Sequence, residues 1–456
     1  MNRYSYLLAL FLMISCEQKN TQPMTTEIDI IDQNMVETES EPDLSVINQT
    51  DEGFDVGVTI TNESNDPPSW EQAFIYGSPA TDQVLGLDVL PDLNIVVTGR
   101  TEGNLSNQEN DSFADGFVAF INQLGELVWL KQLGTEGVDQ FLDIVYHPRG
   151  AIFTGGFSTG SLTQQINQQA IDGLLVALDM EGNVLWEKLI DLGTINRLTP
   201  SPTGVIVVGS YEESAGDYAA FVAEYDMQGE RRWLHSFNSP GYDAATSVTI
   251  RNDVVYVTGF TFGSIVSQSS AEFMDIFVAA LSLGGEKRWL NEYGSNKDDS
   301  PVRITNDEQG LIIAGYTNGV FDTQHHGEND IALLKINFEG EMLWQKQIGT
   351  EGSEAAYGLS LTDEGHILVS GRIDDASWDQ FPNQDGDAFM VTFSRTGEHL
   401  TTEQLHIVGR DEIVDIVCRE GQVNIGGYIK SNHSVEDHSD IWVDRFSISD
   451  GLRSYE

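Results

Sequence analysis

Residues 177–193 of the chain read ALDMEGNVLWEKLIDLG, and residues 335–352 read KINFEGEMLWQKQIGTEG. Both stretches place a glycine four residues before a tryptophan, and a polar strand-like run follows the tryptophan. Further copies of this phrase return at a regular interval along the chain, so the sequence contains an internal repeat. A fixed period of about 50 residues is typical of solenoids, propellers and arrays.

Two columns of residues define the repeat in seven units. The first column is a turn glycine: Gly125, Gly182, Gly229, Gly285, Gly340, Gly397 and Gly451. A large side chain follows four residues later in most units, namely Trp129, Trp186, Trp233, Trp289 and Trp344, with Thr401 and Tyr455 in the last two. The second column ends a run rich in β-branched residues, at Gly99, Gly156, Gly209, Gly259, Gly315, Gly371 and Gly427. We interpret these tryptophans and glycines as structural.

Each unit contains four short segments with strand-like alternation, here called A to D. In the fourth unit they are ATSVTI, VVYVTGF, DIFVAALSL and KRWLNEYG, separated by turn residues. Four antiparallel strands repeated seven times predict an all-β, seven-bladed β-propeller. The last unit stops where its D strand begins, and Trp70 opens a similar D-strand phrase ahead of the first unit. We therefore expect the 70–77 strand, with Trp70 as a structural residue, to complete the last blade and close the ring.

Units such as DIVYHPRGAIFTGGFSTG, from Asp143, resemble the seven-bladed β-propeller repeat of bacterial exported and surface proteins. The resemblance covers about residues 70–456 and implies the fold, but it implies no particular activity. The D-strand phrase also resembles the tryptophan-docking motif of quinoprotein propellers. Those propellers usually have eight blades, whereas this chain has seven units.

The N-terminus indicates export and a lipid anchor. The opening MNRYSYLLALFLMISC joins one arginine to an apolar run too short to span a bilayer, which is typical of a signal peptide. Its ending resembles a lipobox, so we expect residues 1–15 to be a lipoprotein signal peptide and Cys16 to be lipidated; an ordinary signal peptide is the alternative. Residues 16–66 are acidic and polar and predict a disordered tether. The propeller then takes 67–456.

The charge balance limits the partners. Asp and Glu number 72 against 23 Lys and Arg, a formal net charge of −49, so a nucleic-acid partner is excluded. We expect a monomer in the bacterial cell envelope, attached to the outer membrane by its lipid alone, with an envelope protein or a polysaccharide as partner. Cys418 lies in a strand-like run, which favours a structural thiol over a nucleophile.

Motifs that could support catalysis have structural explanations. GFSTG, around Ser158, matches the nucleophile elbow, but it follows a B strand where the elbow requires a strand, a turn and a helix. An aspartate opens six C strands, at Asp115, Asp172, Asp275, Asp330, Asp387 and Asp440, with Ala219 in the third unit. These carboxylates favour local hydrogen bonding. Calcium is the alternative ligand for them, and no other cofactor is predicted.

The connections between strands differ in length. The AB and CD turns are short, whereas most BC loops are long and varied, and long loops on a rigid scaffold often bind ligands. Aromatic and ionisable residues of the BC loops in units five to seven form the predicted site: Trp378, Phe381, Asp379, Asp385, His325, His326, His433 and His438. Capping of the blade edge is an equal interpretation of the two aromatics. The leading hypothesis is a non-catalytic module that binds a protein or glycan, and a calcium-dependent or quinoprotein-like propeller enzyme is the alternative.

Overall fold

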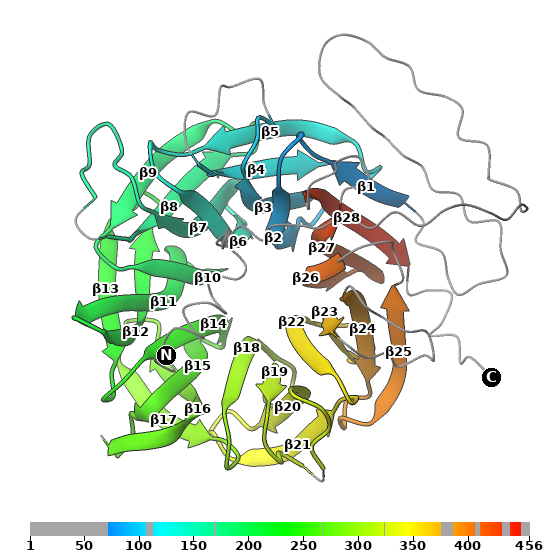
Figure 1. The fold of residues 1–456 in the computed structure, drawn as a ribbon. Coiled ribbons are helices and arrows are strands. Elements are labelled where there is room, and N and C mark those ends of the chain that lie inside the picture. The colour runs from blue at the N-terminus through cyan, green and yellow to red at the C-terminus, as the bar shows by residue number, and fades with distance from the viewer. Residues whose placement is uncertain are drawn as a thin grey trace, which may run out of the picture. The chain divides into compact units, whose positions relative to one another are not determined.

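The computed structural model describes residues 72–105, 113–167, 170–267, 269–322, 324–374, 386–405, 411–430 and 438–447. These residues all belong to one compact unit, Phe54–Glu456. In this part of the chain, 28 strands form seven four-stranded antiparallel sheets, which are arranged around a common axis as the blades of a ring (Figure 1). The prediction of a seven-bladed β-propeller is confirmed.

Six blades are built from consecutive strands, with the A strand next to the axis and the D strand at the rim (Figure 1). Blades 1 to 3 comprise β2 (Asp82–Val89), β3 (Ile95–Thr101), β4 (Asp115–Ile121) and β5 (Leu127–Leu133); β6 (Asp139–His147), β7 (Ala151–Ser158), β8 (Asp172–Asp179) and β9 (Val184–Ile190); and β10 (Thr194–Pro200), β11 (Gly204–Ser214), β12 (Asp217–Asp226) and β13 (Arg231–Phe237). Blades 4 to 6 comprise β14 (Asp243–Arg251), β15 (Val254–Ser264), β16 (Ser269–Ser282) and β17 (Lys287–Tyr293); β18 (Asp299–Asn306), β19 (Leu311–Thr317), β20 (Asp330–Ile336) and β21 (Met342–Ile348); and β22 (Ser353–Leu361), β23 (Ile367–Asp374), β24 (Asp387–Phe393) and β25 (His399–Leu405).

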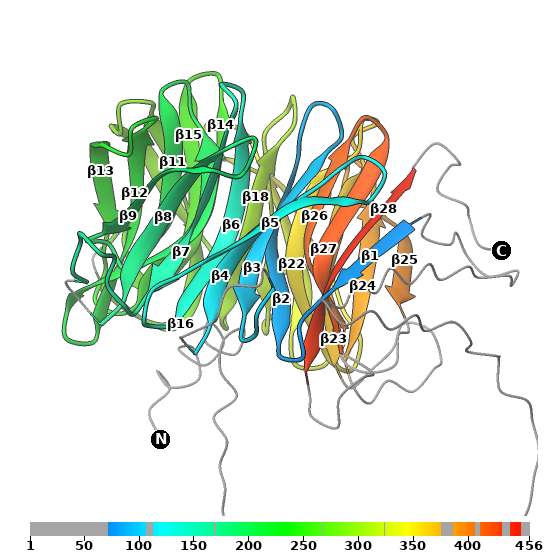
Figure 2. The same ribbon diagram turned by 90° about the horizontal axis from the view of Figure 1, so that it is seen from above.

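Blade 7 joins the two ends of the described chain. It contains β26 (Asp411–Arg419), β27 (Gln422–Lys430) and β28 (Ser439–Ser447), and its fourth strand is β1 (Gln72–Tyr76). β1 pairs with β28 in antiparallel register, with Gln72 opposite Arg445 and Tyr76 opposite Ile441 (Figure 2). β1 therefore lies inside the 70–77 segment that was expected to close the ring, while Trp70 itself lies outside the described residues.

The glycines of the B-strand column are explained by a bulge in each A strand. In β6 the register shifts between Phe141 and Asp143, so the carbonyl of Gln140 turns toward β7. A Cβ built on Gly156 would lie 1.9 Å from that oxygen, and the other six column glycines are blocked in the same way, at 1.8 to 2.1 Å from an A-strand carbonyl. Any side chain would thus push the two inner strands apart.

The hydrophobic core is divided among the seven junctions between blades. In one cluster, Phe153 and Leu175 of blade 2 pack on Val207 and Phe221 of blade 3, and all four are fully buried. Because each blade has two apolar faces, only its neighbours can cover them. This is the physical reason why the sequence repeats.

At the rim, a tryptophan of one blade is locked against the CD turn of the next, a contact we call the indole latch. Trp186 on β9 donates from Nε1 to the carbonyl of Met227 at 2.9 Å, and its ring lies 3.1 Å from the place where a Cβ of Gly229 would stand. Gly229 also has a φ of 79°, which favours glycine. The same bond joins Trp129 to Met180, Trp233 to Leu283 and Trp289 to Phe338. The tryptophan of one blade therefore meets the turn glycine of the next blade.

The junction of blade 7 with blade 1 uses a different donor. The register of β1 places Gln72 where other D strands carry tryptophan. Arg445 of β28 instead donates from Nη1 to the carbonyl of Gln123 at 3.0 Å, two residues before the turn glycine Gly125. This carbonyl is equivalent to the one that each indole latch uses, so an arginine closes the ring.

Candidate functional site

Inside the ring, the second halves of six A strands line a central cavity of about 460 Å³. Its walls are partly apolar, with Leu87, Ile144 and Leu198 from three blades. Pro91 and Pro148 of the AB turns also line it. The cavity therefore lies toward the end of the ring that carries the AB and CD turns, which we call the turn face. The opposite end, with the DA and BC connections, is the loop face.

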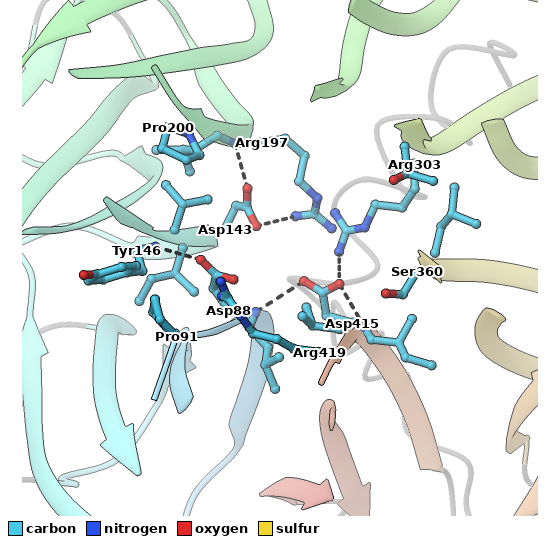
Figure 3. Close-up of a pocket in the computed structure, with 18 of the residues that line it drawn as sticks. Asp88, Pro91, Asp143, Tyr146, Arg197, Pro200, Arg303, Ser360, Asp415 and Arg419 are labelled. Atoms are coloured by element: carbon cyan, nitrogen blue, oxygen red, sulfur yellow. Dashed lines mark hydrogen bonds and ion pairs between the residues drawn. The ribbon is translucent and has the colours of Figure 1, made fainter. Parts of the chain in front are cut away.

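Four charged residues reach the cavity from equivalent positions. Asp143, Arg197, Arg303 and Asp415 each follow the bulge of their A strand directly. A bulge breaks the alternation of the strand and re-aims the next side chain, here toward the axis (Figure 3). The equivalent residue of blade 4 is Ser247. One backbone irregularity, repeated around the ring, thus sets the polar lining.

The two carboxylates at this position, Asp143 and Asp415, each link their own blade to the next one. Asp143 accepts the backbone N–H of Leu198 at 2.7 Å, and Asp415 accepts that of Leu87 at 3.2 Å. Asp88 repeats the pattern two residues along β2, because its Oδ2 accepts the N–H of Tyr146 at 2.8 Å. These bonds form an inner ring of contacts between blades, beside the outer ring of indole latches.

Burial changes the acidity of these carboxylates. Burial, which disfavours the charged form, raises the pKa of Asp88 to about 7 and that of Asp143 to about 7. The pKa of Asp415 is also raised by burial, against the opposing effect of the Arg303 guanidinium. The net charge of the cavity lining therefore becomes more positive as the pH falls from 8 to 6.

Three arginines also face the cavity. Arg197 donates to the carbonyl of Leu142 at 2.7 Å and lies 3.8 Å from Asp143, and Arg419 donates to the carbonyl of Val89. Arg303 extends from blade 5 to blade 7, where its Nη2 lies 2.9 Å from Oδ1 of Asp415 (Figure 3). This pair is buried, with 8% and 9% of the two side chains exposed.

The residues predicted from the sequence lie elsewhere. His325 Nδ1 is 3.4 Å from Asp330 at the start of β20, and the backbone N–H of His326 donates to the same carboxylate at 2.8 Å. His438 precedes β28, so blade 6 separates it from the other two histidines. The remaining predicted binding residues and the lipidation site lie outside the described residues: Trp378, Phe381, Asp379, Asp385, His433 and Cys16.

The residues with potential catalytic chemistry take part in structural contacts. Ser158 is buried at the end of β7, where its Oγ lies 3.2 Å from Thr135 Oγ1 and accepts the N–H of Gly160. Burial raises the pKa of the half-buried Cys418 thiol to about 11, so it stays protonated at neutral pH.

Two kinds of feature are absent from the described residues. They contain no group of three or more His, Cys, Asp or Glu side chains placed to hold a metal ion. They also contain no helix with the length and apolarity to cross a membrane.

The C-strand aspartates act inside their own blades. Gln132 donates to Asp115 at 2.8 Å, and Gln347 donates to Asp330 at 2.6 Å. A third D-strand glutamine, Gln404, donates to Asp387 at 2.8 Å. In three blades these bonds join the start of the C strand to the D strand. The C-strand aspartates of these blades therefore have a structural role.

The cavity residues were missed by the sequence analysis, although a signal existed. Asp143, Arg197, Arg303 and Asp415 each stand inside a β-rich run and keep the period of the repeat. A charge in the innermost strand of a propeller must face the axis or a neighbouring blade. Each of the four stands 12 or 13 residues before the B-strand glycine of its unit, and this nearly constant spacing is the signal.

Comparisons with known proteins add to the description of the fold. No protein-family model matches the chain, and no curated protein matches it. Solved structures are similar at low identity: Sqt1 from Chaetomium thermophilum (TM-score 0.46, 10% identity, 78% of this chain and 81% of that chain) and the WD40 β-propeller domain of Doa1 (TM-score 0.48, 13% identity, 82% and 95%). Both similarities concern the fold.

Proposed function

We propose that this protein is a non-catalytic binding and scaffold module of the bacterial cell envelope. In this proposal it holds a protein or glycan partner on its loop face and is attached to the membrane through a lipid on Cys16. The rest of the chain between Cys16 and the propeller is the tether, 16–66. Its acidic composition gives it a reach that keeps the ring away from the lipid headgroups.

The observation that supports binding is the asymmetry between the two faces. On the turn face the connections are as short as 252–253 and 420–421. On the loop face the BC connections of blades 1, 2 and 5 take 102–114, 159–171 and 318–329, whereas those of blades 3 and 4, 215–216 and 265–268, are short. The latched ring beneath them is rigid, and such scaffolds commonly present binding residues on loops.

The partner class follows from the composition of these loops. Trp378 and Phe381 stand in a loop otherwise rich in Asp, Asn and Gln, and aromatic rings beside polar groups suit stacking on sugar rings or anchoring a protein partner. The charge of −49 favours partners that are basic or neutral.

The test of binding is a loop-face variant, Trp378→Ala with Phe381→Ala. We expect it to lose capture of the native partner from envelope extract, and binding on a glycan array, by about tenfold or more, since a hot-spot aromatic contributes about 2 kcal/mol or more. The matched control is Leu343→Ala with Leu400→Ala, two rim residues that are 49% and 42% exposed. Equal binding by both variants would place the site elsewhere, and unfolding of the first would assign the aromatics to the core.

The test of attachment is Cys16→Ser. We expect the wild-type protein to fractionate with detergent-extracted membranes and the variant to be released or to remain unprocessed. A variant that stays in the membrane fraction, with processing like that of the wild type, would contradict the lipid anchor.

A further inference from the structure

The feature that points to a ligand is an arginine without enough acceptors. Arg303 is 6% exposed, and its Nη1 has no hydrogen-bond partner among the described residues. Its only ion pair there is the one between Nη2 and Asp415. An unsatisfied buried donor is costly, more so when it belongs to a charged group. The cavity in front of it is large enough to hold the missing acceptor.

The other two cavity arginines each donate to a backbone carbonyl, although Nε of Arg197 is also buried without a hydrogen-bond partner among the described residues. Arg197 and Arg419 are held by backbone carbonyls of the neighbouring blade, Leu142 and Val89. Figure 3 shows the guanidinium groups of Arg197 and Arg303 pointing toward one another. Two cations that face each other in a half-buried space repel, and an anion between them would convert this repulsion into attraction.

The charge of the cavity contrasts with that of the chain. Three arginines oppose Asp88, Asp143 and Asp415, and the first two carboxylates have a pKa of about 7 because they are buried. At neutral pH the lining is therefore neutral to positive inside a molecule of charge −49. A singly charged anion suits this lining better than a dianion, which would meet the carboxylate of Asp415 at close range.

The apolar walls define the rest of the ligand. Leu87, Ile144, Leu198 and Leu359 line the cavity beside the charged groups, and the volume of about 460 Å³ is within the range of small-molecule sites. A carboxylate also matches the planar fork of a guanidinium, since its two oxygens can accept parallel N–H bonds.

We propose that the central cavity binds a small organic carboxylate, whose oxygens accept hydrogen bonds from Arg303 and Arg197 while its apolar part lies against Leu87, Ile144 and Leu198. The ligand enters from the turn face. This site is separate from the partner surface proposed on the loop face, so either site can exist without the other.

The experiment is calorimetric titration of the purified full chain with acetate, hexanoate and benzoate. The neutral isostere hexanamide and inorganic phosphate serve as comparison probes. We expect at least one carboxylate to bind at one site per chain, with hexanamide and phosphate weaker by about tenfold or more, the factor of one charge-assisted hydrogen bond. The proposal would be overturned if acetate, hexanoate and benzoate all failed to bind. It would also be overturned if hexanamide or phosphate bound as tightly as the best carboxylate.

Variants then locate the site. Arg303→Gln should weaken carboxylate binding by about tenfold or more, and Arg288→Gln, an exposed arginine on β17, should leave it unchanged. Because Arg303→Gln leaves the buried Asp415 without its cation, the double variant Arg303→Gln with Asp415→Asn removes both charges and preserves the fold. A double variant that melts like the wild type and still binds hexanoate like the wild type would assign the ligand to another site.

Discussion

The inner and outer rings of this propeller join the same seven blades by different chemistry. At the rim, four junctions repeat one contact, an indole N–H on a carbonyl above a glycine, as with Trp186, Met227 and Gly229. Around the axis, the equivalent position changes from Asp143 to Ser247 to Asp415, and each of these accepts a backbone N–H of the next blade.

The difference shows where a repeat protein can vary. The indole latch depends on a bulky ring, a glycine with positive φ and a carbonyl acceptor. A change in the ring or the glycine removes the packing contact between them. The inner contact needs only an acceptor, which Asp and Ser both supply. The inner ring can therefore exchange residues and acquire charges, and the central cavity is located there.

The largest expected effect comes from removing one whole strand of the outer ring. Deleting residues 67–77 removes β1, which exposes the edge of β28 and uncovers the apolar contacts of Phe74 and Tyr76 with blade 1. We expect a loss of about 5 kcal/mol or more of unfolding free energy, measured by denaturant titration. Deleting 17–60 is the control and should leave the midpoint unchanged; equal midpoints for both truncations would contradict ring closure by β1.

A single latch should matter less than a strand. Trp186→Ala removes a half-buried ring and its bond to Met227, so we expect a loss of about 3 kcal/mol in unfolding free energy. Leu185→Ala, at the exposed neighbouring position, should change it by less than about 0.5 kcal/mol. Similar losses for the two variants would show that the latch adds nothing to the stability of the ring.

The inner ring should respond to pH where the indole latches do not. The pKa of Asp88 is raised from 3.8 to about 7, so the folded state holds a proton that the unfolded state releases. Its contribution to stability is full below pH 4 and is lost as pH rises through 7. We expect Asp88→Asn to reduce the fall in unfolding free energy between pH 5 and pH 8 by about 2 kcal/mol.

The matched control for this pH effect is Asp92→Asn. Asp92 is an exposed aspartate in the AB turn that follows β2. This variant should keep the pH profile of the wild type. A profile of Asp88→Asn that overlays the wild-type profile would show that the buried carboxylate is ionised in both states.

The smallest effect is expected at the arginine that substitutes for a tryptophan. Arg445→Met removes bonds to the carbonyls of Gln123 and Leu93, which water can partly replace, so we expect a loss of about 1 kcal/mol. The acceptors are neutral, and the loss should therefore be independent of salt. A loss as large as that of Trp186→Ala would mean that ring closure depends on this residue as much as on a full latch.

The sequence predicted the outer ring well for a physical reason. Five of the seven units carry tryptophan at this position, as at Trp129 and Trp289, and so large a side chain repeated at a fixed spacing is visible in one sequence. The B-strand glycines, which lie at the inner strands, are visible in the sequence for a similar reason. A Cβ on Gly259 would lie 2.1 Å from the carbonyl oxygen of Ala244, so no other residue fits.

The inner ring was not predicted, since its position tolerates Asp, Ser and Arg and looks irregular in the sequence. The bulge that aims these residues at the axis is a property of the folded blade, and no single residue type encodes it. Arg445 was missed because it lies on the C strand β28 and not on the D strand, where the other blades carry the tryptophan. The D strand β1 has Gln72 at that position, opposite Arg445. The binding role of Trp378 and Phe381, which lie outside the described residues, stays a prediction.

The pairing of β1 with β28 also means that the ring can close only after the C-terminal strand has been synthesised. Gln72 meets Arg445 across about 370 residues, and at a synthesis rate of roughly 5–20 residues per second this partner emerges about 20–75 s later. During that time β1 is a strand without a sheet, and such edges invite wrong pairing. At five residues it is too short to hold a foreign strand firmly, so the brevity of β1 protects the growing chain until the last blade closes.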